Sequence, residues 1–234
     1  MLIAIYLNNN IPRRQIKKSE SISYPFRLVC PVVLAIVIPI LLITSCFPRS
    51  ALTRQAEHLY KEGQSLLSRG KGEEAMVKFE ESLSLAKKAG SLPGVAHNLN
   101  EMAIIYTSRG KYSKGRELLQ ESLIIYRKAT MKPEISKVLN NIAITYIKEH
   151  SFTKALDQYT ELLQWDRKTE NYLGVGITFY NMGLLYEHHI KNIEEAKKNY
   201  QHALTTFRKI GNEKYIQLVD KKMSLLVKKN ELHQ

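Results

Sequence analysis

The feature that most constrains this chain is a ladder of small residues that recurs every 40 positions. Gly63, Ala103, Ala143 and Gly183 form it. A large apolar residue stands four positions before each of them, and a tyrosine or leucine stands three positions after: Leu59, Leu99, Leu139 and Phe179, then Leu66, Tyr106, Tyr146 and Tyr186. Self-similarity at a period of this size indicates an array of stacked structural repeats.

Each period contains two amphipathic helices. The clearest copy has apolar residues at three- and four-residue spacing, broken once: Leu139, Ile142, Ala143, Tyr146, then Phe152, Ala155, Tyr159, Leu162. The expected breaks are Gly70–Gly72, Gly110–Lys111, Glu149–Ser151 and His188–Asn192. Pro93 and Pro133 stand where a first helix should begin. The pattern therefore predicts a first helix, a tight turn, a second helix and a longer loop in each unit.

A second set of small residues recurs early in the second helices, at Ala75, Gly115, Ala155 and Ala196. Helix axes that pack about 8–10 Å apart need small side chains at their closest contact. We therefore expect each to pair with the small residue of the first helix in its unit.

These positions resemble the tetratricopeptide repeat, with its Leu-Gly/Ala-x-x-Tyr core followed by Ala-x-x-x-Phe/Tyr. The matching residues are Gly63, Ala75, Phe79, Ala103, Tyr106, Ala143, Tyr146, Ala155, Tyr159, Gly183, Tyr186, Ala196, Tyr200 and Ala203. The resemblance implies an all-α, right-handed superhelix, an α-solenoid of four helix-turn-helix repeats.

Three features depart from the usual repeat. The period is 40 rather than about 34 residues, which resembles a longer-helix subgroup that includes kinesin light chains and bacterial peptide-sensing regulators. Gly115 and Leu119 replace the usual alanine and aromatic residue of unit two. Unit four carries one extra residue, which we expect in its turn, between Gly183 and Ala196.

The expected domain organisation follows from these repeats. A leader occupies residues 1–45, a short tether 46–51 and the repeat domain 52–230. Its units cover 52–92, 93–132, 133–171 and 172–211. Residues 212–230 carry an apolar stripe of Ile216, Val219, Met223 and Leu226, which predicts a capping helix over the last apolar face.

The leader is typical of an export signal. Its first 27 residues hold five basic residues and one acid, and Leu28–Ser45 is uncharged. The ending Ile43-Thr44-Ser45-Cys46 resembles the lipobox of bacterial lipoproteins, which implies cleavage before Cys46 and a lipid anchor such as palmitate on it. Phe47, where an aspartate would favour the inner membrane, implies the outer membrane in a Gram-negative cell. The alternative is an uncleaved transmembrane helix.

The composition favours no enzymatic site, cofactor or metal. Gly70-Lys71-Gly72 lacks the frame of a phosphate-binding loop, and Glu187, His188, His189 and His202 suit a solvated turn better than a metal centre. Both cysteines, Cys30 and Cys46, lie before the repeats, so we expect no disulfide there. The net charge of +13 suits a solvated surface, and the export signal argues against nucleic-acid binding.

The family resemblance places the first helices along a concave groove and points two positions of each into it. These are Tyr60, Asn100, Asn140 and Tyr180 at one phase, and Gln64, Ile104, Ile144 and Leu184 at the other. We expect the aliphatic residues to hold apolar side chains of an extended peptide, and Asn100 and Asn140, outside the core, to bond its backbone. Lys148 would pair with a carboxylate of the ligand.

The functional expectation is a non-enzymatic, lipid-anchored adaptor of the bacterial cell envelope that binds a partner protein in this groove. The alternative is a receptor for a short peptide or small ligand. The sequence does not indicate an oligomeric state.

Overall fold

The computed structural model describes the backbone of residues 31–231 and the side chains of residues 49–226. Residues 1–30 of the predicted leader lie outside this description, and so do the side chains of residues 31–45 and of Cys46. The chain divides into two compact units, Met1–Ile43 and Thr44–Gln234, and the second holds the repeats. Among the described residues, no helix has the length and apolar character needed to cross a membrane.

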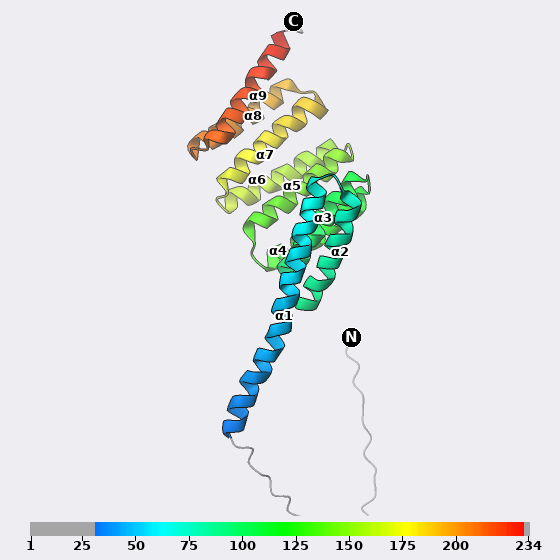
Figure 1. Ribbon diagram of the computed structural model, residues 1–234. Helices are drawn as coiled ribbons and strands as arrows, with labels where there is room; N and C mark the ends of the chain where they lie inside the picture. The colour runs from blue at the N-terminus through cyan, green and yellow to red at the C-terminus, as the bar shows by residue number, and fades with distance from the viewer. Residues whose placement is uncertain (1–30, 232–234) are drawn as a thin grey trace, which may run out of the picture. The chain divides into compact units, whose positions relative to one another are not determined.

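The described backbone consists of helices joined by short turns and contains no strand, which confirms the all-α prediction (Figure 1). Helices α1, α3, α5 and α7 are the first helices of the units and are called A helices below; α2, α4, α6 and α8 are the B helices. Their bounds are α1 Pro31–Ser68, α2 Gly72–Ala89, α3 Leu92–Ser108, α4 Tyr112–Lys128, α5 Lys132–Lys148, α6 Phe152–Lys168, α7 Tyr172–Leu185 and α8 Ile193–Lys209. The predicted capping helix is α9, Glu213–Glu231.

Helix α1 passes without a break through residues 46–51, where the sequence predicts a tether. From α2 onward each helix packs against the next one in the chain, and neighbouring A helices also meet, α3 with α5 and α5 with α7. The repeat domain is therefore an array of consecutive helix pairs, as predicted.

The connections between units differ from the prediction. We expected tight turns inside units and longer loops between them. Instead a residue with positive φ ends a helix about every 20 positions: Gly70, Gly90, Gly110, Thr130, His150, Glu170, Lys191 and Gly211. Turns within and between units are therefore equally short, because a single left-handed residue reverses the chain at each of them.

We predicted that the extra residue of unit four lies in the turn, and this prediction is wrong. It is absorbed by a π-helical segment, η1, Tyr186–Ile190, which continues α7. A π-helix widens the ring of its hydrogen bonds by one residue. The left-handed turn residue consequently shifts by one position, to Lys191, and Ala196 keeps its place at the contact between α7 and α8.

The A and B helices of a unit meet where a small residue faces an aromatic ring. A Cβ added to Gly63 would lie 2.7 Å from the ring of Phe79, and one added to Gly183 would lie 2.5 Å from that of Tyr200. Both distances are shorter than van der Waals contact allows. A β-carbon at either position would therefore force the ring to shift. The predicted pairing of two small residues is seen in unit two, where a Cβ added to Gly115 would lie 3.1 Å from the carbonyl oxygen of Ala103. In units one and four the glycine of the A helix faces a ring instead.

Candidate binding face

The A helices are joined to one another by side-chain hydrogen bonds that repeat at a spacing of 41 residues. Nδ2 of Asn141 donates to Oδ1 of Asn100, 2.9 Å away, and Nδ2 of Asn181 donates to Oδ1 of Asn140, 3.0 Å away. The hydroxyl of Tyr60 donates to Oε1 of Glu101 at the same register, over 3.3 Å. We call these three pairs the interhelix ladder.

Asn100 does not occupy the exposed position that we predicted. Its side chain is 2% exposed, its carbonyl oxygen accepts from Asn141, and its Nδ2 donates to Glu101. Both ends of the amide are thus used inside the array, so Asn100 holds neighbouring A helices together. Asn140 is half-buried, and only its carbonyl oxygen has a partner among the described residues, so its Nδ2 remains able to donate.

Glu101 is the acceptor at one end of the ladder. Its carboxylate is 6% exposed and accepts from Tyr60, Asn100 and Lys137. Burial, and then the negative charge of Glu101, raise the pKa of Tyr60 above its ordinary value. Tyr60 therefore remains a neutral hydrogen-bond donor at neutral pH.

Three of the predicted site residues lie together in one pocket. Ile104 of α3 and Ile144 and Lys148 of α5 line a space of about 490 Å³, which we call the Ile144 pocket. Its other lining residues are Thr107, Ser108, Leu119, Asn141 and Thr145. The sequence identified the two isoleucines and the lysine by their phase on the A helices, but it gave no indication of the rest.

The departure of unit two from the repeat pattern accounts for this pocket. Leu119 of α4 stands where units one, three and four have Phe79, Tyr159 and Tyr200. Leucine is smaller than an aromatic ring, and Leu119 forms part of the pocket lining. The polar groups around it are already paired, since the hydroxyls of Thr107 and Thr145 lie 3.1 Å apart and Thr145 donates to the Asn141 carbonyl. The pocket thus offers mainly apolar surface with one cation, Lys148, which is exposed.

The remaining predicted residues are dispersed. Gln64 is exposed and donates to the hydroxyl of Tyr60. Tyr180 packs its ring 5.6 Å from that of Tyr200, and burial raises the pKa of Tyr180. Leu184 packs with it against the apolar core of the last unit. The structure therefore does not join all nine predicted positions into one continuous site.

The acidic and histidine cluster of unit four has a structural role at Glu187. This carboxylate accepts hydrogen bonds from the hydroxyl of Tyr200, at 2.6 Å, and from Nζ of Lys222 on α9, at 3.0 Å. It thereby ties η1 to α8 and to the capping helix. His189 lies against the ring of Phe152 instead, and the described residues contain no group of metal-ligating side chains large enough to hold an ion.

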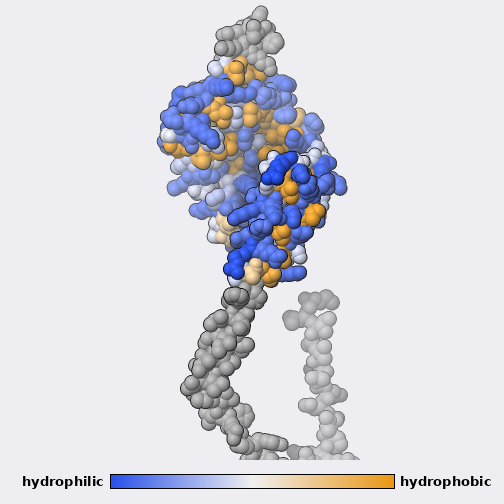
Figure 2. All heavy atoms as spheres, viewed as in Figure 1, coloured by the Kyte–Doolittle hydropathy of each residue, from blue (hydrophilic) through white to orange (hydrophobic). Residues whose placement is uncertain are grey.

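The surface of the repeat domain is mixed in character. On the face drawn in Figure 2, apolar residues form small patches within a hydrophilic surface. Ile144 is one of the exposed large apolar residues, at 37%, and Ile124 on α4 is another, at 55%. Such isolated residues are ordinary on soluble proteins, so the position of Ile144 in a pocket between two A helices distinguishes it.

Comparison with protein families identifies the repeats. Residues 95–130 and residues 134–209 match two family models, both described as tetratricopeptide repeat. The structure is similar to the crystal structure of BtubC (BKLC) from P. vanneervenii, with a TM-score of 0.53 and 14% sequence identity over 78% of this chain and 91% of that chain. This likeness concerns the fold alone. No curated protein sequence matches the chain.

Proposed function

We propose that the chain is a non-enzymatic adaptor that binds a segment of a partner protein on its A helices. Residues 95–130 and 134–209 match tetratricopeptide repeat models, and such repeats are protein–protein interaction modules. The observation that carries this proposal is the Ile144 pocket. It opens between two A helices, it is lined mainly by apolar groups, and a lysine stands beside it.

The chemistry of the pocket suits one or two side chains of an extended segment. Ile104, Leu119 and Ile144 offer apolar surface to an aliphatic or aromatic side chain, because removing such a group from water contributes about 25 cal/mol per Å². Lys148 can pair with a carboxylate of the partner. The amide Nδ2 of Asn140, on the same helix, is able to donate to a backbone carbonyl.

We place this adaptor in the bacterial cell envelope, anchored by a lipid on Cys46. The support is the sequence of the leader: its basic start, its uncharged segment and its cysteine. Labelling cells with a palmitate analogue should mark the wild-type protein, and Cys46→Ser should abolish both the label and the mass shift of processing. A Cys46→Ser protein that stays in the membrane at unchanged mass would favour an uncleaved transmembrane anchor.

Site-specific photo-crosslinking tests the binding face. A crosslinking amino acid at position 144 should capture a partner in cells that express the full chain, whereas one at position 124 on α4 should not. Ile124 is the matched control because it is an equally large residue and is more exposed. Equal capture at both positions, or capture at 124 alone, would contradict the proposal. If the residue at position 144 instead crosslinks to a short peptide and this crosslinking saturates, the result would favour a peptide receptor.

A further inference from the structure

Two pockets of the array have the same construction and lie 80 residues apart. Each is formed by two consecutive A helices and the end of the B helix between them. The lining of the first, which we call the Ala86 pocket, includes Glu57, Tyr60, Ala86, Gly94, His97 and Asn98. The second, the Asp166 pocket, is lined by the residues 80 positions later, which include Lys137, Asn140, Asp166, Gly174, Ile177 and Thr178.

The equivalent position between them is filled by the chain itself. Tyr126 occupies the site that corresponds to Ala86 and Asp166, and it is 2% exposed. The oxygen of its hydroxyl lies 2.7 Å from Nδ1 of His97. Gly94 and Gly174 face Ala86 and Asp166 in the two open pockets, where the filled position has Glu134. The open pockets therefore differ from the filled position at one B-helix residue and at the A-helix residue that faces it.

Each open pocket contains a buried oxygen without a hydrogen-bond partner. Within the part of the chain that the structure describes, Asn98 Oδ1 and Asp166 Oδ2 are the two buried side-chain acceptors in this condition. Both residues are 1% exposed. Leaving such an acceptor unpaired costs the free energy of its lost hydration, so each pocket lacks a hydrogen-bond donor.

The orientation of the Asn98 amide is fixed by its neighbours. Its Nδ2 donates to the carbonyl oxygen of Gly94, at 2.8 Å, and to the hydroxyl of Ser82, at 2.9 Å. That hydroxyl donates in turn to the Ala56 carbonyl. A rotated amide would bring two carbonyl oxygens together, so the unpaired atom of Asn98 is its oxygen.

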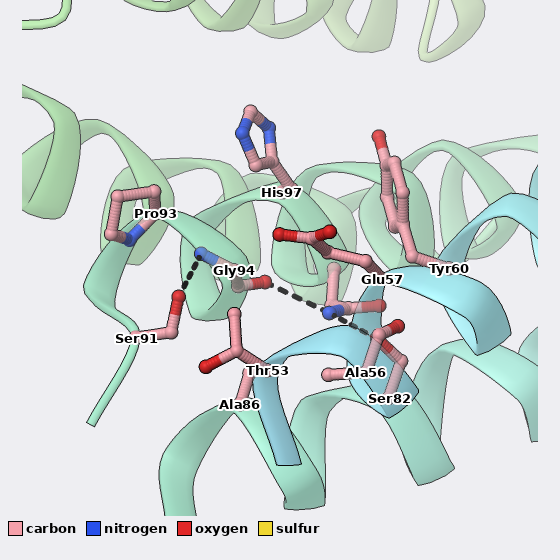
Figure 3. A pocket seen from close by; sticks show the side chains of 11 residues that line it. Thr53, Ala56, Glu57, Tyr60, Ser82, Ala86, Ser91, Pro93, Gly94 and His97 are labelled. Carbon is pink, nitrogen blue, oxygen red and sulfur yellow. Dashed lines mark hydrogen bonds between the residues drawn. The ribbon is translucent and has the colours of Figure 1, made fainter. Parts of the chain in front are cut away.

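The surroundings of the Ala86 pocket favour a cation. Glu57 brings a carboxylate to it, and Tyr60 and His97 bring two rings whose centroids are 5.8 Å apart (Figure 3). Burial lowers the pKa of His97, so that its ring adds no positive charge at neutral pH. Carboxylates, amide oxygens and aromatic faces are the groups that bind ammonium and guanidinium ions in proteins.

We propose that the Ala86 pocket binds the ammonium or guanidinium group of a lysine or arginine side chain of the partner. This deepens the proposed function and rests on it. The cation donates to Asn98 Oδ1 and pairs with Glu57. The Asp166 pocket is not part of the proposal, because Lys137 stands there where the first pocket has Glu57.

The binding test uses the purified full chain in detergent and fluorescent octalysine as the probe. Octa(Nε-acetyl-lysine) is the matched probe without charge. The chain carries a net charge of +13, which repels oligolysine at long range. Octalysine that binds must therefore contact acceptor groups of the chain at short range. Octalysine should bind, and the acetylated peptide should bind at least tenfold more weakly.

Two substitutions locate the site. Ala86→Tyr copies the natural filling by Tyr126 and should weaken octalysine binding at least tenfold, whereas Ser84→Tyr, at an exposed position of the same helix, should change it less than twofold. Glu57→Gln keeps the shape of the pocket and should weaken binding several-fold, in contrast to Glu80→Gln on the exposed side of α2.

Circular dichroism shows whether each variant folds. If Ala86→Tyr does not fold, octalysine binding by Glu57→Gln decides whether the Ala86 pocket is the site. Unchanged octalysine binding in Glu57→Gln and in a folded Ala86→Tyr protein would overturn the proposal. If Ala86→Tyr weakens the binding of spermidine and leaves octalysine binding unchanged, the pocket would be assigned to a free polyamine instead. Crosslinking at position 144 is independent of these outcomes, so a failure here leaves the proposed function standing.

Discussion

Asn141 donates a hydrogen bond from its Nδ2 to Oδ1 of Asn100, across the contact between α5 and α3. The bond joins the A helices of units two and three through a fully enclosed amide. It shows that an asparagine predicted to meet a ligand is a structural link between repeats.

Asn100→Ala is therefore expected to destabilise the fold. The substitution removes the acceptor of Asn141 and a donor to Glu101, and a lost buried hydrogen bond with an unpaired partner costs about 1–3 kcal/mol. Urea denaturation followed by circular dichroism measures it. Asn140→Ala should cost less, because that side chain is only half-buried. Equal stability of Asn100→Ala and wild type would contradict the ladder as a source of stability.

Glu187→Gln should destabilise the attachment of α9 in a pH-dependent way. Burial acts to raise the pKa of Glu187, but the hydrogen bonds from Tyr200 and Lys222 outweigh it, so that the pKa lies below the ordinary value of 4.5. A lowered folded pKa adds stability that is complete above about pH 4.5 and is lost as the pH falls through the folded value. The difference in Tm between wild type and Glu187→Gln should thus be greatest near neutral pH and shrink in acid. A constant difference would mean that packing alone is involved.

Asp166→Asn should have the opposite effect on stability. Burial raises the pKa of Asp166, although hydrogen bonds from Ser136 and Asn171 act against this. A raised folded pKa means that ionisation costs stability above the ordinary carboxyl pKa and that protonation restores it in acid. We expect a higher Tm than wild type at pH 7 and a smaller gain as the pH falls through the folded pKa. A lower Tm at pH 7 would show that the carboxylate is needed for packing.

Leu119→Phe should close the Ile144 pocket. The aromatic ring matches those of the other units, which pack fully buried against glycine or alanine. Filling a cavity commonly adds about 0.5–2 kcal/mol of stability, and the variant should lose crosslinking at position 144. Leu118→Phe, a buried neighbour outside this pocket, is the control. Retained crosslinking in a folded Leu119→Phe protein would show that the partner does not need the pocket.

Thr130→Gly should stabilise the turn between α4 and α5. Thr130 has φ 53°, a left-handed conformation that is strained for a β-branched residue and free of strain for glycine. Removing about 1–2 kcal/mol of strain is opposed by the greater chain entropy of glycine, so the net gain should be about 1 kcal/mol or less. Thermal unfolding measures it. Thr107→Gly, inside α3, is the contrasting substitution and should destabilise.

The sequence predicted the helix pairs well because the small residues of the A helices recur at a fixed interval. It did not predict the short turns between units, since Thr130 and Glu170 are not residues that ordinarily mark a left-handed turn. The placement of the extra residue was also missed: an insertion shows in the spacing from Gly183 to Ala196, but whether a turn or a helix absorbs it depends on packing.

The positions of the candidate residues were predicted only in part. Phase along the A helices grouped Ile104, Ile144 and Lys148, which line one pocket, because it depends on one helix at a time. Their role in binding stays a prediction. The burial of Asn100 depends on Asn141 of the next repeat, and the spacing of 41 residues between Asn100 and Asn141, and again between Asn140 and Asn181, was the one available indication. The open pockets differ from the filled position at the B-helix residue, held by Ala86, Tyr126 and Asp166, and at the A-helix residue that faces it. The apolar pattern does not reveal either difference.

The π-helical segment at Tyr186–Ile190 has a consequence for how such arrays change in length. A residue inserted into a strictly periodic chain would rotate every later side chain by about 100° around its helix axis. Here the wider turn takes up that rotation before α8 begins, so that Ala196, Tyr200 and Phe207 remain buried. A one-residue insertion is thus confined to a single helix end, and the final helices of this protein can acquire or lose a residue in evolution without repacking the units that precede them.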